Sequence, residues 1–257
     1  MKRRTPVTTH LRPVVLRFDS LPSTNTEAAR QAALGADEGL CVVAREQTRG
    51  RGRLGRVWAS PPDAGLYFSV VLRPALDARA SPLLTLAASV AAADSLRAAC
   101  GVEVDIKWPN DLLAGGRKLC GILAETVETP RGRACVLGIG INLTARAFPP
   151  ELAGAATSVE SVTGAKPDAE ELLRELVRAL GERYARLQSE GGVEETLKAW
   201  SSRSSYAEGR GVRVTADDAI IEGVTRGLET DGALRVETPA GEIRIVRAGD
   251  VAALRPT

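Results

Sequence analysis

The sequence of 257 residues predicts an α+β protein in which a large sheet is flanked by helices and followed by a small carboxy-terminal β-barrel. Apolar runs rich in Val, Ile and Leu lie between glycines, as strands of a sheet do, and long helical patterns separate or follow them. After Trp200 the sequence changes to short β-type runs divided by turn signals, which predicts the barrel. The length suits one large domain with a small appended one.

Capping residues, glycines and prolines delimit the predicted helices. The first is expected to begin within residues 23–27, where Thr24 and Glu27 fit a capping box, and to end at Gly35. The second begins at Ser81-Pro82, ends at Cys100-Gly101 and is apolar nearly all round, which predicts a buried helix. The third opens at Asp168 and has one apolar face, so we expect it to cover a sheet.

Short apolar runs supply the predicted strands. In the large sheet these are residues 40–46, 66–73, 102–108, 119–127 and 136–143. In the barrel they are residues 212–215, 219–225, 233–238 and 242–246. The predicted organisation is a loose tail at 1–13, a large domain at 14–207 and a small β domain at 208–257.

Composition excludes several classes of chemistry. The single histidine, His10, cannot build a multi-histidine metal site, and a Ser/His/Asp or Cys/His pair would depend on that one residue near the amino terminus. Four cysteines without CxxC spacing indicate buried free thiols. The net charge of +2 predicts no general attraction to nucleic acid or membrane. Without a secretory signal, and with the longest apolar run interrupted by Asp94, we expect a cytoplasmic protein.

Residues 47–58 form the sharpest local feature, because four arginines and three glycines occur there with no acid. Clustered guanidinium groups repel one another unless an anion binds, and glycines let a backbone approach a ligand closely. The run therefore predicts a phosphate-bearing small-molecule ligand. Trp58 could stack on a purine or on the aliphatic stem of an arginine. A solvated basic loop and a Gly/Arg contact to RNA are the alternatives.

A second segment concentrates lysine, although lysine is scarce in this chain. Lys107 and Lys118 are two of only five lysines, against 29 arginines. A compact ammonium group suits a carboxylate or acyl-phosphate oxygen, where a planar guanidinium would not. The alternative is a plain β-hairpin with surface lysines, turning at residues 109–111 with its tip at Gly115-Gly116.

Five motifs, in this order and spacing, resemble the biotin protein ligase family. They are Ser23-Thr24-Asn25, the 47–58 run, Lys107-Trp108-Pro109-Asn110-Asp111, Lys118 with Gly121-Ile122-Leu123, and Gly138-Ile139-Gly140-Ile141-Asn142. With glycines of the carboxy-terminal region, the resemblance covers about residues 14–255. It implies a class II synthetase or biotin ligase-like fold, with a mixed, mainly antiparallel sheet and an SH3-like barrel.

The resemblance implies a two-step activity. Biotin's carboxylate attacks the α-phosphate of ATP, giving biotinyl-5′-AMP and pyrophosphate, and a lysine of a biotin carboxyl carrier domain then displaces AMP. ATP with Mg²⁺ and biotin are thus the expected substrates. No direct protein motif for the metal is present, and Asp111 is the residue expected near it.

Site roles follow from the resemblance, residue by residue. Biotin would be bound by Ser23, Thr24, Asn25, Gln47, Gly50, Arg51, Gly52, Lys118 and Gly121. ATP or the adenylate would be bound by Arg51, Arg53, Arg56, Trp58, Asn110 and Asn142. The catalytic residues would be Lys118, Arg53, Asp111 and Lys107.

The sequence departs from the family pattern in two places, and three other functions remain as alternatives. The first motif arrives at Ser23, so we expect no amino-terminal winged-helix domain, no DNA partner and no repressor activity; a homodimer is left open. The usual Gly-Ile-Asp of the carboxy-terminal domain is Gly227-Leu228-Glu229 here, which leaves the contacts of that domain open. The rivals are a lipoate or octanoyl ligase or transferase of related fold, an RNA-binding protein, and an inactive ligase kept as a biotin sensor.

Overall fold

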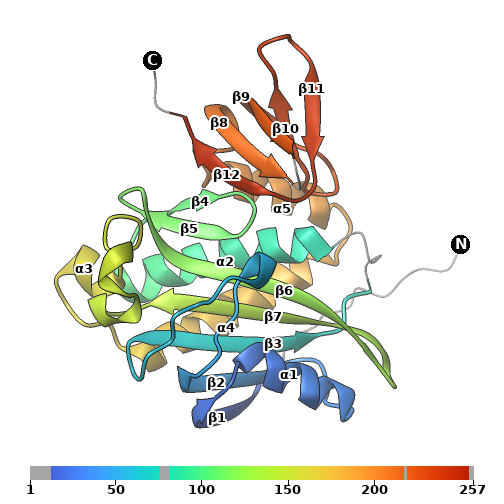
Figure 1. Cartoon of the computed structure of the whole chain (residues 1–257). Helices are drawn as coiled ribbons and strands as arrows, with labels where there is room; N and C mark the ends of the chain where they lie inside the picture. The colour runs from blue at the N-terminus through green and yellow to red at the C-terminus, as the bar shows by residue number, and fades with distance from the viewer. Residues whose placement is uncertain (1–12, 76–80, 217–218, 255–257) are drawn as a thin grey trace, which may run out of the picture.

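The structure, a computed structural model, describes residues 13–75, 81–216 and 219–254. Its larger part is a seven-stranded sheet with helices on both faces, and its smaller part is a five-stranded sheet (Figure 1). The strands of the large sheet are β1 (Val14–Leu21), β2 (Leu40–Gln47), β3 (Gly65–Leu72), β4 (Asp105–Lys107), β5 (Asp111–Ala114), β6 (Arg117–Thr129) and β7 (Gly132–Asn142).

Strand order in the large sheet is β1-β2-β3-β7-β6-β5-β4. Only β1 and β2 run parallel, and the other neighbours are antiparallel, so the expected mixed, mainly antiparallel sheet is confirmed. Successive side chains of a strand point to opposite faces, so β3 contributes Phe68 and Val70 to one apolar cluster and Val71 to the other. Both faces of the central strands are therefore buried.

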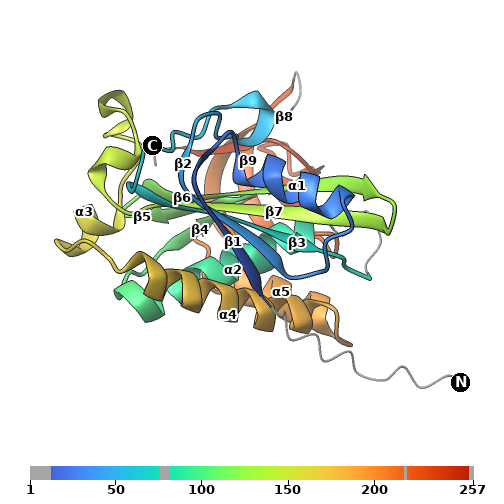
Figure 2. The same ribbon diagram turned by 90° about the horizontal axis from the view of Figure 1, so that it is seen from below.

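Helices cover the two faces unequally. Helix α1 (Thr24–Ala33) packs on one face, while α2 (Ser81–Cys100), α4 (Ala169–Leu187) and α5 (Gly192–Ser201) lie on the other (Figure 2). The short helix α3 (Val159–Thr163) follows the turns η3 (Ala145–Ala147) and η4 (Pro150–Leu152). The turn η1 (Arg53–Gly55) lies on the same side as α1.

Helix α2 is buried, as its all-round apolar sequence predicts. By length and composition its segment from Pro82 to Cys100 could span a membrane, but 67% of it is buried inside the protein. Helix α4 begins as predicted, with the Asp168 side chain accepting hydrogen bonds from the backbone N–H groups of Glu170 and Glu171. Its apolar face, which includes Leu176 and Leu180, packs into the core.

The four cysteines are free thiols, as expected. Cys41, Cys120 and Cys135 are buried, and Cys100 is partly exposed. Burial raises the pKa of Cys41 and Cys135 to about 12, so these thiols stay protonated at neutral pH.

The second sheet contains β8 (Glu208–Ala216), β9 (Ala219–Leu228), β10 (Leu234–Glu237), β11 (Ile243–Val246) and β12 (Asp250–Ala253). Its order is β11-β10-β9-β8-β12, all antiparallel. The buried Trp108 indole of the large domain donates a hydrogen bond to the Gly232 carbonyl at 3.0 Å. Trp108 therefore joins the two parts of the molecule.

Several local expectations were wrong. Thr24 does not cap α1: Ser23 is the N-cap residue, and Glu27 pairs with Arg30 instead of closing a capping box. The strand expected at 102–108 is confined to β4, because residues 101–104 connect it to α2. Strands β1 and β12 and helix α5 were not predicted as elements. The loose tail at 1–13 lies outside the described residues except for Pro13.

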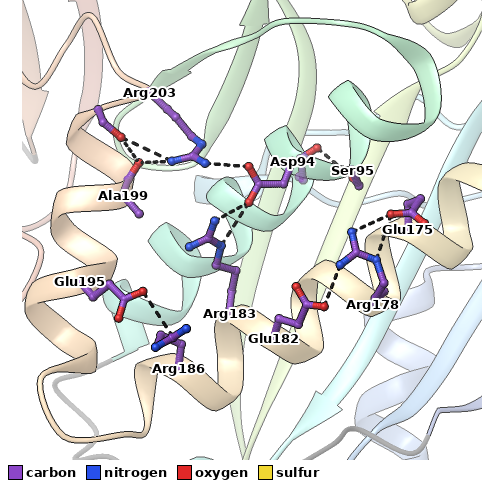
Figure 3. A network of polar contacts seen from close by, with 12 residues as sticks. Asp94, Ser95, Glu175, Arg178, Glu182, Arg183, Arg186, Glu195, Ala199 and Arg203 are labelled. Carbon is purple, nitrogen blue, oxygen red and sulfur yellow. Dashed lines mark hydrogen bonds and ion pairs between the residues drawn. The ribbon is translucent and has the colours of Figure 1, made fainter.

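A polar network ties three helices together (Figure 3). Asp94 of α2 accepts hydrogen bonds from Arg183 of α4 at 2.6 Å and from Arg203, which follows α5, at 2.9 Å. All three side chains are largely withdrawn from water, with exposed fractions of 25–32%. One carboxylate thus neutralises two guanidinium groups at a position where water could not fully stabilise their charges.

Replacing Asp94 by Asn should lower the free energy of unfolding by about 1–2 kcal/mol, because two partly buried guanidinium groups lose their counter-charge. Urea denaturation measures this. Glu182→Gln is the matched control: it removes an exposed pair with Arg178, which should cost less than about 0.5 kcal/mol. Equal destabilisation by the two substitutions would contradict this role for Asp94.

Candidate active site

A cavity on the α1 face of the large sheet collects most of the residues that the sequence motifs singled out. Its walls come from the start of α1, the end of β2, the loop that follows it, strands β3, β5, β6 and β7, and β12 of the small sheet. Its polar and aromatic lining comprises Ser23, Thr24, Asn25, Gln47, Arg51, Arg53, Arg56, Trp58, Tyr67, Phe68, Asn110, Asp111, Lys118 and Asp250.

The floor is one row of residues across the sheet. Tyr67 pairs with Gly140, Gly140 with Gly121, Gly121 with Asp111, and Asp111 with Lys107, on five successive strands. Residues directly opposite each other on adjacent strands share a face. The sheet therefore presents an aromatic ring, two bare glycines, a carboxylate and an ammonium group in line.

The indole of Trp58 lies on the two glycines. A Cβ atom added to Gly140 would lie 2.6 Å from Trp58 Nε1, and one added to Gly121 would lie 2.9 Å from Trp58 Cζ3. No larger residue fits at either position without moving the ring. Gly121 therefore makes room for Trp58, and it also lies in the cavity lining, where the resemblance places it beside biotin. The buried Trp58 N–H has no hydrogen-bond partner among the residues that the structure describes.

The inner end of the cavity is a hydrogen-bond network. Gln47 Oε1 accepts from Thr24 N at 2.8 Å and from Thr24 Oγ1 at 3.1 Å, and Gln47 Nε2 donates to Ser60 Oγ at 2.8 Å. Ser69 Oγ lies 2.7 Å from Thr24 Oγ1 and 2.6 Å from Asn25 Oδ1. These buried groups orient one another, whereas the Ser23 hydroxyl makes no capping bond to its own helix.

Protein groups hold both ends of the Asn25 side-chain amide. Its Nδ2 donates to Glu125 Oε2 at 2.7 Å and to the Leu123 carbonyl at 3.3 Å. A Cβ on Gly138 would lie 2.0 Å from Asn25 Oδ1, so Gly138 provides the space that this amide occupies.

Cations converge at the outer end. Lys118 Nζ lies 2.6 Å from Asp111 Oδ1 and 5.3 Å from the centre of the Trp58 ring, a cation–π geometry. Burial lowers the pKa of the Lys107 ammonium; Asp111 acts in the opposite direction, and Lys118 and Arg56 lower the pKa further. The two lysines are therefore not surface groups of a plain hairpin.

Carboxylates of the protein itself compensate two of the loop arginines. Arg51 Nη2 lies 2.7 Å from Glu125 Oε2, and Arg56 forms an ion pair with Asp250 of β12. The inference that the loop needs an external anion was therefore too simple, because carboxylates distant in sequence also approach it.

Arg53 forms no such ion pair with any residue that the structure describes. Its Nη1 donates to Asn110 Oδ1 at 3.3 Å and to the Gly249 carbonyl at 3.2 Å. Burial lowers the pKa of Arg53, with a further decrease from Arg56, while Asp111 acts in the opposite direction. Of the three loop arginines that line the cavity, Arg53 is thus the one whose charge an anion would stabilise most.

Three predicted residues lie outside the cavity lining. Gly50 is packed against the Trp58 carbonyl, 2.3 Å from an added Cβ. Lys107 stands behind Asp111 in the floor row. The buried Asn142 donates to the Thr157 carbonyl at 3.0 Å, so its amide fixes the segment before α3. Gly52 lies in the lining.

Motif reasoning missed three supporting residues, Ser60, Ser69 and Glu125, and it gave no site role to Asp250, which lies in the carboxy-terminal motif Gly249-Asp250-Val251. The two serines had no local signal. Glu125 follows Gly121 at a spacing of four, which places both on the same face of β6, and this strand periodicity could have revealed it.

The arrangement can activate a carboxylate on a phosphorus centre. Ammonium and guanidinium groups lie around a small space beside the Trp58 indole, as the stabilisation of developing negative charge requires. No cluster of three or more His, Cys, Asp or Glu residues that could hold a metal ion occurs within residues 13–75, 81–216 and 219–254.

Comparison with known proteins agrees with this geometry. Residues 17–142 match the model of the "Biotin/lipoate A/B protein ligase family", and residues 209–253 match the "Biotin protein ligase C terminal domain". The biotin–[acetyl-CoA-carboxylase] ligase of Paracoccus denitrificans is 36% identical over 89% of this chain and 96% of its own length. The chain belongs to the biotin protein ligase family.

Other biotin protein ligases are similar over most of the chain. The biotin–[acetyl-CoA-carboxylase] ligase of Mycobacterium tuberculosis is 36% identical over 91% of this chain and 86% of its own. The bifunctional ligase/repressor BirA of Bacillus subtilis is 37% identical over 91% of this chain and 72% of its own. The Aquifex aeolicus biotin protein ligase, solved with biotin and ATP, has a TM-score of 0.81 at 28% identity, covering 94% and 99% of the two chains.

Gly140→Ala should displace the Trp58 indole and destabilise this biotin protein ligase by about 1–3 kcal/mol, because the new methyl group overlaps the ring. Tryptophan fluorescence detects the displacement, since Trp108 and Trp200 are fully buried and Trp58 is not. Gly154→Ala is the control, because nothing lies within 4 Å of its added Cβ. An unchanged emission spectrum in Gly140→Ala would show that the contact is not present.

Proposed function

We propose that this chain is an ATP-dependent ligase that activates biotin as biotinyl-5′-AMP and transfers it to a lysine of a biotin carboxyl carrier domain. The chain belongs to the biotin protein ligase family, and the observation that supports the proposal most directly is the row of residues in the cavity floor. In this row an apolar platform, formed by Trp58 on Gly121 and Gly140, lies beside the charged pair of Lys118 and Asp111. An acyl chain and a phosphate can lie side by side there.

Adenylation requires two anions to approach each other. Biotin's carboxylate must attack the α-phosphate of ATP, and negative charge accumulates on the phosphoryl oxygens as pyrophosphate leaves. Lys118 would neutralise the carboxylate and a non-bridging oxygen, because its ammonium group is near both the platform and Asp111. Fixed cations in a partly dry site stabilise such charge without reorganisation.

The arginine loop would close the site over the substrates. Of the three loop arginines that line the cavity, Arg53 alone forms no ion pair with a carboxylate of the described residues, so it is the lining guanidinium most available to phosphate. Arg51 and Arg56 would orient the loop through Glu125 and Asp250. The small domain takes part because Gly249 and Asp250 lie against this loop.

ATP would bring Mg²⁺. Mg²⁺ usually keeps several waters and uses one or two carboxylates plus phosphate oxygens, and Asp111, on the cavity lining, supplies one carboxylate that fits. The metal would neutralise phosphate charge there.

The second step needs little further machinery. An unprotonated lysine amine of the carrier attacks the acyl carbon, and AMP leaves as a stabilised phosphate. Correct placement of the mixed anhydride supplies most of the acceleration. Because the reaction consumes ATP and modifies a carrier protein, we propose the cytoplasm as its compartment.

Pyrophosphate–ATP exchange tests the substrate directly. Biotin, lipoate and octanoate are offered in parallel, and we expect exchange with biotin alone. Exchange with lipoate but not biotin would overturn the assignment, and RNA binding without exchange would favour the non-enzymatic reading of the arginine loop.

Lys118→Arg should reduce adenylation about 100-fold while keeping the positive charge, since a guanidinium cannot reproduce the point contact of an ammonium group. Single-turnover formation of biotinyl-5′-AMP is the measurement. Lys198→Arg, on the exposed side of α5, should leave the rate unchanged. Near-normal adenylation by Lys118→Arg would contradict the role proposed for Lys118 in adenylation.

A further inference from the structure

Glu125 is a carboxylate that none of the sequence motifs includes. It lies on β6 two residues after Leu123, which lines the cavity, and on the same face of the strand. Its Oε2 accepts a hydrogen bond from Asn25 Nδ2 at 2.7 Å and another from Arg51 Nη2 at 2.7 Å. One carboxylate oxygen thus links the start of α1, the arginine loop and the centre of the sheet.

The three partners differ in how firmly the fold holds them. Glu125 belongs to a central strand, where it pairs with Val136 of β7, and its side chain is 31% exposed. Arg51 lies on a loop and its side chain is 46% exposed. The carboxylate is therefore the fixed member, and it determines where the guanidinium stands.

Glu125 also decides how the Asn25 amide is oriented. An amide has a donor end and an acceptor end, and the network distinguishes them: Ser69 Oγ meets Oδ1, while Glu125 and the Leu123 carbonyl meet Nδ2. A carboxylate only accepts, so it permits one orientation of the amide. Loss of Glu125 would leave the donor end with the longer 3.3 Å bond alone.

Glu125 orients the guanidinium group of Arg51 in the same way. A guanidinium has five N–H donors in one plane, and a single bond to Glu125 leaves donors on the cavity side, where Arg51 forms part of the lining. Without its carboxylate partner, the side chain would lose this orientation and would be repelled by the other cations of the loop.

We propose that Glu125 is a positioning residue that sets the affinity for the ring of biotin, an inference that rests on the proposed function. A cyclic urea offers a carbonyl acceptor and two N–H donors, so its recognition depends on oriented polar groups. Glu125 orients two of them, Asn25 and Arg51, without lining the cavity itself. Loss of Glu125 should therefore change the KM for biotin and leave kcat nearly unchanged.

The test compares Glu125→Ala and Glu125→Gln with the parent chain by pyrophosphate–ATP exchange, varying biotin and ATP separately, with Tm measured on each protein. Glu125→Ala should raise the KM for biotin about tenfold, with kcat and the KM for ATP within about twofold of the parent. Glu125→Gln retains an acceptor for Asn25 but not the charge that faces Arg51, so its KM should rise about threefold.

Glu128→Ala is the matched control. Glu128 lies on the same strand and pairs with Arg133 at 3.0 Å, but it is exposed and lies away from the cavity. It should leave both KM values unchanged.

Three results would overturn the proposal: an unchanged KM for biotin in Glu125→Ala, a lowered Tm without a change in that KM, or an equal rise in both KM values. If Glu125→Ala does not fold, Glu125→Gln decides by the same criteria. Absence of biotin-dependent exchange in the parent would refute the proposed function and this inference with it. Normal exchange in the parent with unaltered variants would refute the role of Glu125 alone.

Discussion

The contact between the Trp58 indole and the backbone of Gly121 and Gly140 is the constraint on which the rest of the site depends. The two glycines face each other on adjacent antiparallel strands, so together they form a patch without side chains. The ring fills this patch and fixes the end of the arginine loop against the sheet, and Lys118 lies over the ring. The Trp58 indole on its two glycines thus positions both the arginine loop and the Lys118 ammonium group.

Charge compensation imposes the second constraint. Five cations, Arg51, Arg53, Arg56, Lys107 and Lys118, gather around the Trp58 indole, and three carboxylates, Asp111, Glu125 and Asp250, oppose them. The carboxylates come from β5, β6 and β12, so both parts of the molecule contribute. An excess of positive charge remains for anionic substrates, while each carboxylate fixes the direction of a particular side chain.

Local patterns predicted much of the fold and failed where position depends on distant partners. The continuous apolar character of α2 and the cap at Asp168 are local, so helices α2 and α4 were expected with their correct starts. Strand β1 is an edge strand whose exposed polar residues obscure its periodicity, and only its parallel pairing with β2 defines it. Thr24 fits a capping box by spacing, but Gln47 and Ser69 bind its side chain instead.

The sequence by itself determined the types of chemistry available: one histidine, scarce lysines, a glycine-arginine loop and ordered motifs that specify a family. The tertiary structure decided which of those groups meet. Lys107, Asp111, Gly121, Gly140 and Tyr67 become one row only through strand register, and Glu125 and Asp250 reach the arginines only after distant strands are in place. Motifs record spacing along the chain, whereas register and charge pairing arise from contacts between segments that no local pattern encodes.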